Sequence, residues 1–158
     1  MSYLVPIKID QKLPPAERRK LFRAGVEGLV HAMADSPKPR YGDDVAPLKH
    51  TFVPGAYVRE ITMPANNVYV TKVHKIEHAF FVLRGECIVA TEDGNQTIKG
   101  PYWGVTKPGT QRVIYTKEET VWITVHVTDS TDRKEIEKQL ISPTYLDALE
   151  GPNKGGLL

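Results

Sequence analysis

The chain has 158 residues, of which 41% are hydrophobic and 25% are charged, and its formal net charge is +2. This length predicts one globular domain with a hydrophobic core, and this charge excludes a strong general attraction for nucleic acid or a membrane surface. One cysteine excludes an intrachain disulfide, and the sequence shows no signal peptide or membrane-length apolar run, so we predict a cytoplasmic protein without membrane contact.

The first predicted element is a helix over residues 14–34, which opens on proline, as the first turn of a helix tolerates. Phe22, Val26, Leu29 and Met33 follow at steps of four, three and four, so they form one apolar stripe. We expect this stripe to need a covering surface, either the chain's own strands or a partner.

The start of this helix is basic, because residues 17–23 contain three arginines and a lysine. Positive charge is unfavourable at the N-terminal end of a helix, so these side chains form either a solvated face or contacts elsewhere. Residues 35–49 hold three prolines and a glycine, which predicts an irregular linker.

From about residue 51 to 127 the sequence consists of short runs rich in β-branched and aromatic residues, separated by turn signals. This pattern predicts an antiparallel β-sandwich or barrel. A short helix follows in "STDRKEIEKQLI", with Asp132 and Glu135 placed for a capping box. We therefore divide the chain into an N-terminal helical arm and linker (1–49), a β-barrel (50–128), and a C-terminal helix and tail (129–158).

Residues 74–78, "HKIEH", match the pattern H-x-x-E-H, which on a helix would place two imidazoles and a carboxylate as in a zinc peptidase. The flanking segments "VYVTKV" and "AFFVLRG" favour strands and leave no room for a helix. The motif is therefore predicted to lie on strands, and the peptidase interpretation is rejected.

Strand alternation then predicts which side chains share a face. On the first strand the shared face carries Val68, Val70, Lys72 and His74. On the following strand it carries His78, Phe80 and Val82. With both sets turned inward, Lys72, His74 and His78 would meet at one end of the barrel in a concave polar site with apolar walls.

At these residues the sequence resembles the cupin superfamily. The first cupin motif, G-x5-H-x-H-x3–4-E-x6-G, has its spacing matched by Asn66, Lys72, His74, His78 and Gly85. The family's "yVLeGe" stretch corresponds to "FVLRGE". The resemblance covers about half the chain and implies a mainly β fold, a cupin-type antiparallel barrel or jelly roll carrying the N-terminal helix and the short C-terminal helix.

The second cupin motif, G-x5-P-x-G-x2-H-x3-N, falls on "GPYWGVTKPGTQRVIYT". Gly109 takes the glycine position, Arg112 the histidine position and Thr116 the asparagine position, while Pro108 is displaced by one residue. As a small cupin-like protein, the chain is also similar to uncharacterised proteins of tailed bacteriophages. This resemblance would place it in the host cytoplasm or the virion.

Metal-binding cupins use three histidines and a glutamate, where this chain has lysine, histidine, histidine and arginine. Neither a lysine ammonium nor an arginine guanidinium has a free lone pair for a metal. The resemblance therefore implies a reduced site for one divalent ion (zinc, iron, nickel or manganese) on His74, His78 and His126, provided that His126 points inward. The apolar set Val121, Ile123, Val125 and Val127 competes for that direction.

Each candidate also has a structural alternative. His74 and His78 can be hydrogen-bonded polar residues at a barrel mouth, whereas Lys72 and Arg112 can bind a small anionic ligand. The aromatic side chains Phe80, Phe81, Trp103 and Trp122 are expected in the core. Cys87, in an apolar strand, is expected to be buried and inert.

Three functions are compatible with the sequence: a metal-dependent enzyme of dioxygenase or isomerase type, a small-molecule-binding module, and a non-enzymatic protein of a symmetric assembly. We favour the assembly, because about half of the chain lies outside the barrel and the tail "GPNKGGLL" needs a docking surface. The first 45 residues and the last 15 are expected to carry contacts within a homo-oligomer or with partner proteins.

Overall fold

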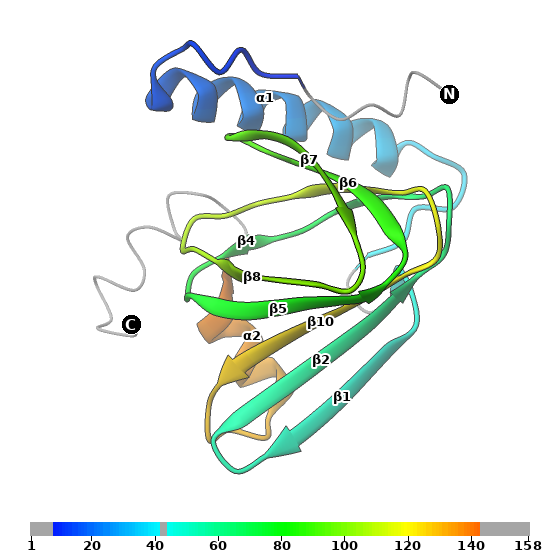
Figure 1. Ribbon diagram of the computed structural model, residues 1–158, viewed down its shortest axis with the longest axis vertical. Helices are drawn as coiled ribbons and strands as arrows, with labels where there is room; N and C mark the ends of the chain where they lie inside the picture. Colours follow the sequence, from blue (N-terminus) through cyan, green and yellow to red (C-terminus); the bar gives the residue numbers. More distant parts are fainter. Residues whose placement is uncertain (1–7, 42–43, 143–158) are drawn as a thin grey trace.

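The computed structural model describes residues 8–41 and 44–142, which form two helices and eleven strands (Figure 1). The helices are α1 (Pro15–Ala34) and α2 (Arg133–Leu140). The strands are β1 (Leu48–Val53), β2 (Ala56–Met63), β3 (Val68–Val70), β4 (Val73–His74), β5 (His78–Arg84), β6 (Glu86–Thr91), β7 (Gly94–Lys99), β8 (Tyr102–Thr106), β9 (Val113–Thr116), β10 (Thr120–Val127) and β11 (Ile141–Ser142).

The strands form a jelly roll of antiparallel sheets, as predicted, although the sheets do not close into a barrel. A five-stranded sheet has the order β1-β2-β10-β5-β8, a four-stranded sheet has the order β3-β9-β6-β7, and β4 pairs with β11. His74 lies at the end of β4 and His78 at the start of β5. The "HKIEH" segment is therefore not helical, and the peptidase interpretation fails.

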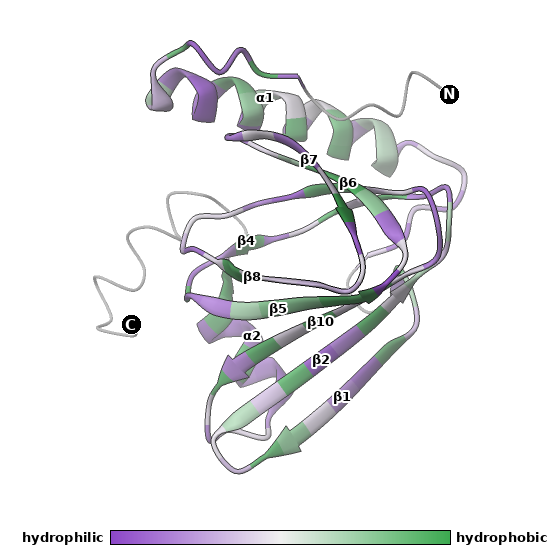
Figure 2. Cartoon of the chain, viewed as in Figure 1, coloured by the Kyte–Doolittle hydropathy of each residue, from purple (hydrophilic) through white to green (hydrophobic). Residues whose placement is uncertain are grey.

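The hydrophobic core fills the space between the two larger sheets. Val82 and Trp122 are directly opposite across β5 and β10, and Trp122 is opposite Ile61 on β2. Val89 on β6 and Ile114 on β9 pack against this row from the facing sheet. Because side chains alternate along a strand, the residues that flank these positions face outward, among them Glu60 and Thr62 beside Ile61 on β2. Figure 2 shows purple, hydrophilic segments between green ones along β2.

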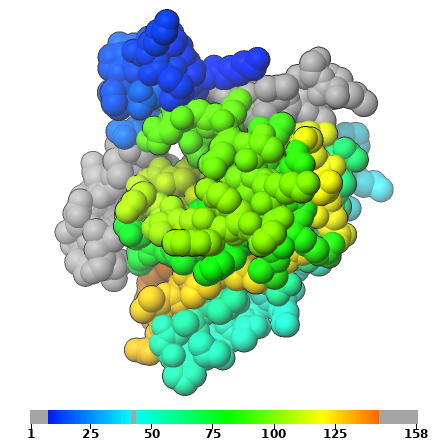
Figure 3. Space-filling model, in the orientation of Figure 1, coloured from blue at the N-terminus to red at the C-terminus, as the bar shows by residue number. Residues whose placement is uncertain are grey.

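Helix α1 covers the other face of the four-stranded sheet. Phe22 and Val26 are buried against Ala90 and Val113, which neighbour the core residues Val89 and Ile114 and so point to the opposite side. In the space-filling view α1 (blue) rests against the green strands (Figure 3). Phe22 and Val26 of the predicted apolar stripe are thus covered by the chain's own sheet, while Leu29 and Met33 are half-buried.

The basic start of α1 also has a local role. Arg18 Nη2 lies 3.4 Å from Asp93 Oδ1, and Arg19 Nε lies 3.0 Å from Glu92 Oε2. Both carboxylates belong to the turn between β6 and β7. Each such pair on a partly exposed surface contributes about 0–1 kcal/mol, so their main effect is to fix the position of α1 on the turn.

Helix α2 packs against the five-stranded sheet, where Ile136 and Leu140 cluster with Tyr57 of β2. Asp132 caps the helix, because its Oδ1 accepts hydrogen bonds from Lys134 N (2.9 Å) and Glu135 N (3.4 Å). Only this half of the predicted capping box forms, since Glu135 Oε2 accepts from Ser130 Oγ instead. Within the part of the chain that the structure describes, neither helix is long and apolar enough to cross a membrane.

Two turn positions of the first cupin motif have left-handed backbone conformations. Asn66, at the first glycine position, has φ of 60°, and Gly85, at the last, has φ of 93°. Asparagine and glycine are the residues that tolerate this region best. Gly85 is also crowded, because a Cβ there would lie 2.3 Å from the carbonyl oxygen of Glu119.

We predict that Gly85→Ala lowers the free energy of unfolding by about 1–3 kcal/mol or more, because it adds a disfavoured φ and a backbone collision. Urea unfolding followed by tryptophan fluorescence measures the change. Gly28→Ala is the control, because Gly28 lies in α1 with nothing within 4 Å of its Cβ position. There alanine should instead stabilise the helix by about 0.5–1 kcal/mol. Equal effects of the two substitutions would contradict the packing described for Gly85.

Candidate functional site

The inner face of the five-stranded sheet changes from apolar to polar along its length. One row across the sheet contains Ile61, Trp122 and Val82. Four residues further along β10, the row contains Tyr57 opposite His126, and His78 opposite Thr106. Strand alternation therefore brings His126 onto the same inner face as Trp122, whereas the apolar Val127 is 91% exposed. The inward direction of His126 resolves the question that the sequence left open.

The three predicted histidines form one cluster. The ring centroids of His74 and His78 are 4.8 Å apart, and those of His78 and His126 are 4.3 Å apart. Tyr57 extends the row, with its ring 5.8 Å from His126 and its hydroxyl 2.6 Å from His50 Nδ1. The structure thus joins residues from β2, β4, β5 and β10.

The cluster does not lie at an open mouth, contrary to the sequence-based expectation. Strand β11 pairs with β4 so that Ile141 is opposite His74. Lys75 N donates to the carbonyl of Leu140 (2.7 Å), and Lys75 Nζ donates to that of Lys138 (2.8 Å). The segment that includes α2 therefore covers this end of the jelly roll, and the histidines are enclosed.

Each of the three imidazoles has one nitrogen that lacks a hydrogen-bond partner among the described residues. His78 Nδ1 lies 3.0 Å from the carbonyl of Ile76, so this nitrogen carries the proton and donates it. His126 Nε2 lies 3.0 Å from Thr124 Oγ1. His74 Nδ1, His78 Nε2 and His126 Nδ1 are buried and have no partner among the described residues.

The environment keeps these imidazoles neutral. Burial lowers the pKa of His126 to about 3, and the positive charge of Arg59, together with the charge that His78 would carry if protonated, adds to the effect. Burial also lowers the pKa of His74 well below its usual value, and the charges of His78 and Arg112 reinforce this. The pKa of His78 is lowered by burial against the opposing effect of its hydrogen bond to Ile76.

A divalent metal ion does not fit this cluster well. The unpartnered nitrogens resemble ligands, but Arg59 and Arg112 already make the surroundings positive. Over residues 8–41 and 44–142, no group of three or more His, Cys, Asp or Glu side chains is arranged to hold a metal ion. The metal site on His74, His78 and His126 stays a prediction, and we base no chemistry on it.

Arg112 lies between the histidines and the apolar core. It is 8% exposed, and its Nη2 donates to Thr106 Oγ1 at 3.0 Å. Its guanidinium lies over the rings of Phe80, at 4.9 Å, and Trp122, at 5.6 Å. Burial lowers its pKa to about 10, which still leaves the group charged at neutral pH. Among the described residues Arg112 forms no ion pair with a carboxylate.

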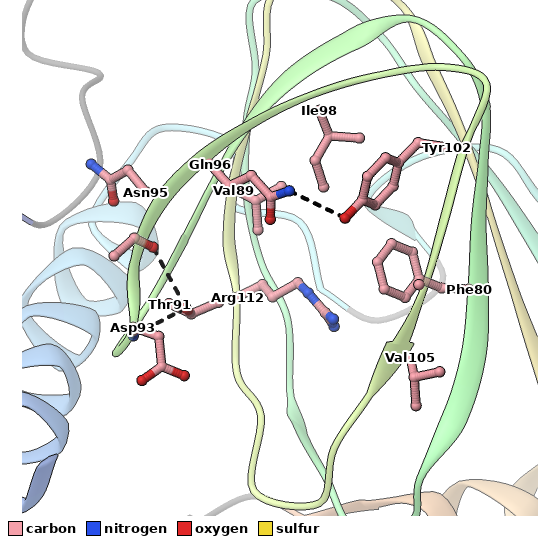
Figure 4. Close-up of a pocket in the computed structure, with 12 residues that line it drawn as sticks. Phe80, Val89, Thr91, Asp93, Asn95, Gln96, Ile98, Tyr102, Val105 and Arg112 are labelled. Carbon is pink, nitrogen blue, oxygen red and sulfur yellow. Dashed lines mark hydrogen bonds between the residues drawn. The ribbon is translucent and has the colours of Figure 1, made fainter.

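Arg112 borders a cavity of about 260 Å³ between β5, β6, β7 and β8. Figure 4 shows its side chain extending into this space toward Phe80, with Val89 and Ile98 on one wall. Gln96 and Tyr102 lie near the rim, where Gln96 Nε2 donates to the Tyr102 hydroxyl at 3.1 Å. A buried cation thus faces a hollow with apolar walls and a polar rim.

The remaining sequence-based site residues lie elsewhere. Lys72 is exposed in the loop between β3 and β4 and does not border the cavity. The prediction that it would join the site was therefore wrong. Glu77 is exposed and pairs with Lys107 at 3.2 Å. Cys87 is fully buried, and burial raises the pKa of its thiol to about 11, so it stays protonated.

The prediction for the aromatic residues was half right. Phe80 and Trp122 are core residues that stack with ring centroids 4.8 Å apart. Trp103 is 67% exposed and Phe81 is 37% exposed, because both lie on the outer face of the five-stranded sheet. Sequence reasoning also missed Gln96 and Tyr102, although alternation from the buried Ile98 places Gln96 on the inner face of β7.

Several solved structures are similar in fold. A cupin-2 domain containing protein from Shewanella frigidimarina is 14% identical, with a TM-score of 0.44, covering 52% of this chain and 80% of its own. KdgF from Halomonas sp. is 12% identical with a TM-score of 0.48, covering 61% and 90%. An acetylacetone dioxygenase from Acinetobacter johnsonii is 12% identical with a TM-score of 0.44, covering 58% and 74%.

No family model matches the chain, and no curated protein matches it significantly. Some of the similar structures are described as cupin domains. At these identities and TM-scores they carry no argument about function, which has to come from the residues of the site.

We predict that the free energy of unfolding falls as the pH is lowered from about 7 to about 4. The folded-state pKa of His126 is about 3, below the ordinary value of 6.5, so between these values the unfolded chain binds more protons. Acid therefore favours unfolding, with a slope approaching ~1.4 kcal/mol per pH unit for each such histidine. Urea unfolding at a series of pH values measures the slope.

Other groups contribute to acid unfolding, so the comparison is between variants. His126→Asn should reduce the slope, whereas His31→Asn, at an exposed position of α1, should leave it unchanged. A slope that is the same in both variants would show that His126 takes up its proton without a cost to folding.

Proposed function

We propose that this protein is a small-molecule-binding module of the cupin-type jelly-roll fold, which binds the anionic group of its ligand at Arg112. The single observation that carries the proposal is the state of this guanidinium. It is buried, it borders a cavity, and in residues 8–41 and 44–142 it has no carboxylate partner.

Burying a charged group without an opposite charge costs on the order of several kcal/mol. Stacking on Phe80 and Trp122 and one hydrogen bond to Thr106 offset part of this cost. The guanidinium has five N–H donors, so most of them are left for another acceptor. An anion in the cavity would accept these donors in charge-assisted hydrogen bonds, which are the stronger kind.

The metal-dependent enzyme remains an alternative prediction. It would require the histidines to bind an ion in spite of the neighbouring arginines. The enzymatic name of one similar structure does not extend to this chain, because the TM-score is 0.44. Arg112 supports ligand binding without such an ion.

We predict that the protein binds benzoate or inorganic phosphate, and that Arg112→Met abolishes the binding of either anion. Truncating one partner of a buried charge pair costs about 2–5 kcal/mol, which corresponds to at least about thirtyfold in affinity. Isothermal titration calorimetry measures the dissociation constants. Trp122 provides a second signal, since it lies under the guanidinium.

Lys72→Met is the matched control, because it removes an equal charge from an exposed position outside the cavity. Binding in this variant should equal that of the unmodified protein. Binding that survives Arg112→Met, or that is lost in Lys72→Met, would move the anion site away from Arg112.

A second candidate function is the homo-oligomeric assembly that the sequence suggested. The tail on which that prediction partly rested lies outside the described residues. A separate observation supports it: the outer face of the five-stranded sheet carries an exposed apolar group on β5 and β8, which we call the outer patch. The outer patch consists of Phe81, Leu83, Trp103 and Val105.

The occupant that we propose for the outer patch is a second copy of the chain. Among the strands of residues 8–41 and 44–142, β8 is last in the order of its sheet, so no described strand pairs with its outer backbone edge and another strand could do so. A two-fold axis beside β8 would bring the same apolar residues of both copies together, which is how most soluble dimers are built. Contacts made by the terminal segments, and a role of the chain as a phage component, stay predictions.

We predict that the unmodified protein is a dimer in light scattering coupled to size-exclusion chromatography, and that Trp103→Glu makes it a monomer. A buried carboxylate at the centre of the contact would lack a partner, so the cost should be several-fold to a hundredfold in the dimer dissociation constant, or about 1–3 kcal/mol. Leu21→Glu is the control, because Leu21 is an exposed residue of α1 outside the outer patch. A monomeric unmodified protein, or a dimer that persists in Trp103→Glu, would exclude this interface.

A further inference from the structure

The cavity beside Arg112 has apolar walls and a polar rim. Phe80, Val89 and Ile98 are buried and apolar, and they border the interior part of the cavity with Arg112. The rim is formed by exposed polar residues of the β6–β7 hairpin, among them Gln96 (Figure 4). A ligand there would place hydrocarbon against the walls and its charged group at the guanidinium.

The direction of the guanidinium is fixed by its neighbours. Phe80 and Trp122 hold one face of the planar group, and Thr106 holds one terminal nitrogen through a 3.0 Å hydrogen bond. Thr106 accepts only one of the two N–H groups of Nη2. The other N–H of Nη2 lies parallel to an N–H of either Nε or Nη1, and two such parallel donors in one plane match the two oxygens of a carboxylate.

The surroundings disfavour a more highly charged ligand. Lys72 is outside the site, so one arginine has to neutralise the anionic group alone. A carboxylate needs one positive charge, whereas a phosphate carries between one and two negative charges at neutral pH. The carboxylate of Asp93 also borders the cavity and opposes a second negative group at the rim.

The size of the cavity limits the hydrocarbon part. Its volume of about 260 Å³ is below the range of about 300–1,000 Å³ that is typical of pockets for drug-sized ligands. Gly104 contributes to the shape, because a Cβ at this position would lie 2.8 Å from the Phe80 ring. Glycine at position 104 therefore allows the Phe80 ring to lie close to β8 where it lines the cavity.

From these four features we infer that the ligand class is a monocarboxylate with a compact aromatic or branched hydrocarbon body, whose carboxylate pairs with Arg112 and whose body packs between Phe80, Val89 and Ile98. This inference rests on the proposed function and makes it more specific. It assigns Val89 and Ile98 as determinants of ligand shape.

The experiment compares dissociation constants of benzoate, acetate, succinate and inorganic phosphate by isothermal titration calorimetry. Benzoate should bind at least about tenfold more tightly than the other three anions, because only benzoate adds apolar burial without a second charge. Val89→Leu narrows the cavity from its buried wall, so it should weaken benzoate about tenfold and leave acetate unchanged.

Val113→Leu is the matched control. Val113 is also buried in the four-stranded sheet, but it faces α1 and does not border the cavity. It should therefore carry a similar packing cost in thermal unfolding and leave benzoate affinity unchanged.

The outcomes separate this inference from the proposed function. If acetate, succinate or phosphate binds as tightly as benzoate through Arg112, or if Val89→Leu and Val113→Leu act alike on benzoate, the monocarboxylate inference is overturned while anion binding stands. If none of the four anions binds, the proposed function itself fails.

Discussion

The arrangement of the interior depends on the buried guanidinium of Arg112. It lies over Phe80 and Trp122 on the five-stranded sheet, although its own residue precedes β9 of the opposite sheet. A cation in this position links the two layers and divides the interior into an apolar part, a cavity and a histidine cluster. Because a charge without an opposite charge is costly to bury, each of these neighbours has to be compatible with it.

The histidine cluster shows this constraint most clearly. Arg112 contributes to the lowered pKa of both His74 and His78, and His126 is held neutral mainly by burial and by the positive charge of Arg59. Neutral imidazoles can pack closely on one another, as the 4.3 Å and 4.8 Å ring separations show. The same positive surroundings disfavour a divalent ion. The cluster therefore fits a packed, enclosed end of the jelly roll beneath α2 better than a metal centre.

Local sequence signals predicted the parts of the fold that depend on local chemistry. The span of α1 follows from its apolar stripe, the strand character of residues 74–78 from their β-branched neighbours, and the turns at Asn66 and Gly85 from motif spacing. Strand alternation placed His74 and His78 on a common inner face, and the resemblance to the second cupin motif singled out Arg112. The rest depends on long-range packing. Lys72 follows β3 in a loop, where alternation no longer applies, and the cover formed by α2 and the outward position of Trp103 are decided by which sheet faces which.

The proposed function requires that Arg112 pairs with an anion from outside the chain, because residues 8–41 and 44–142 supply no carboxylate partner. A crystal structure of the protein grown with benzoate tests it most directly. The account predicts a carboxylate within hydrogen-bond distance of the Arg112 guanidinium, with the ring between Phe80, Val89 and Ile98. A cavity that holds only water, with Arg112 paired to a carboxylate of the chain's own terminal segments, would contradict it.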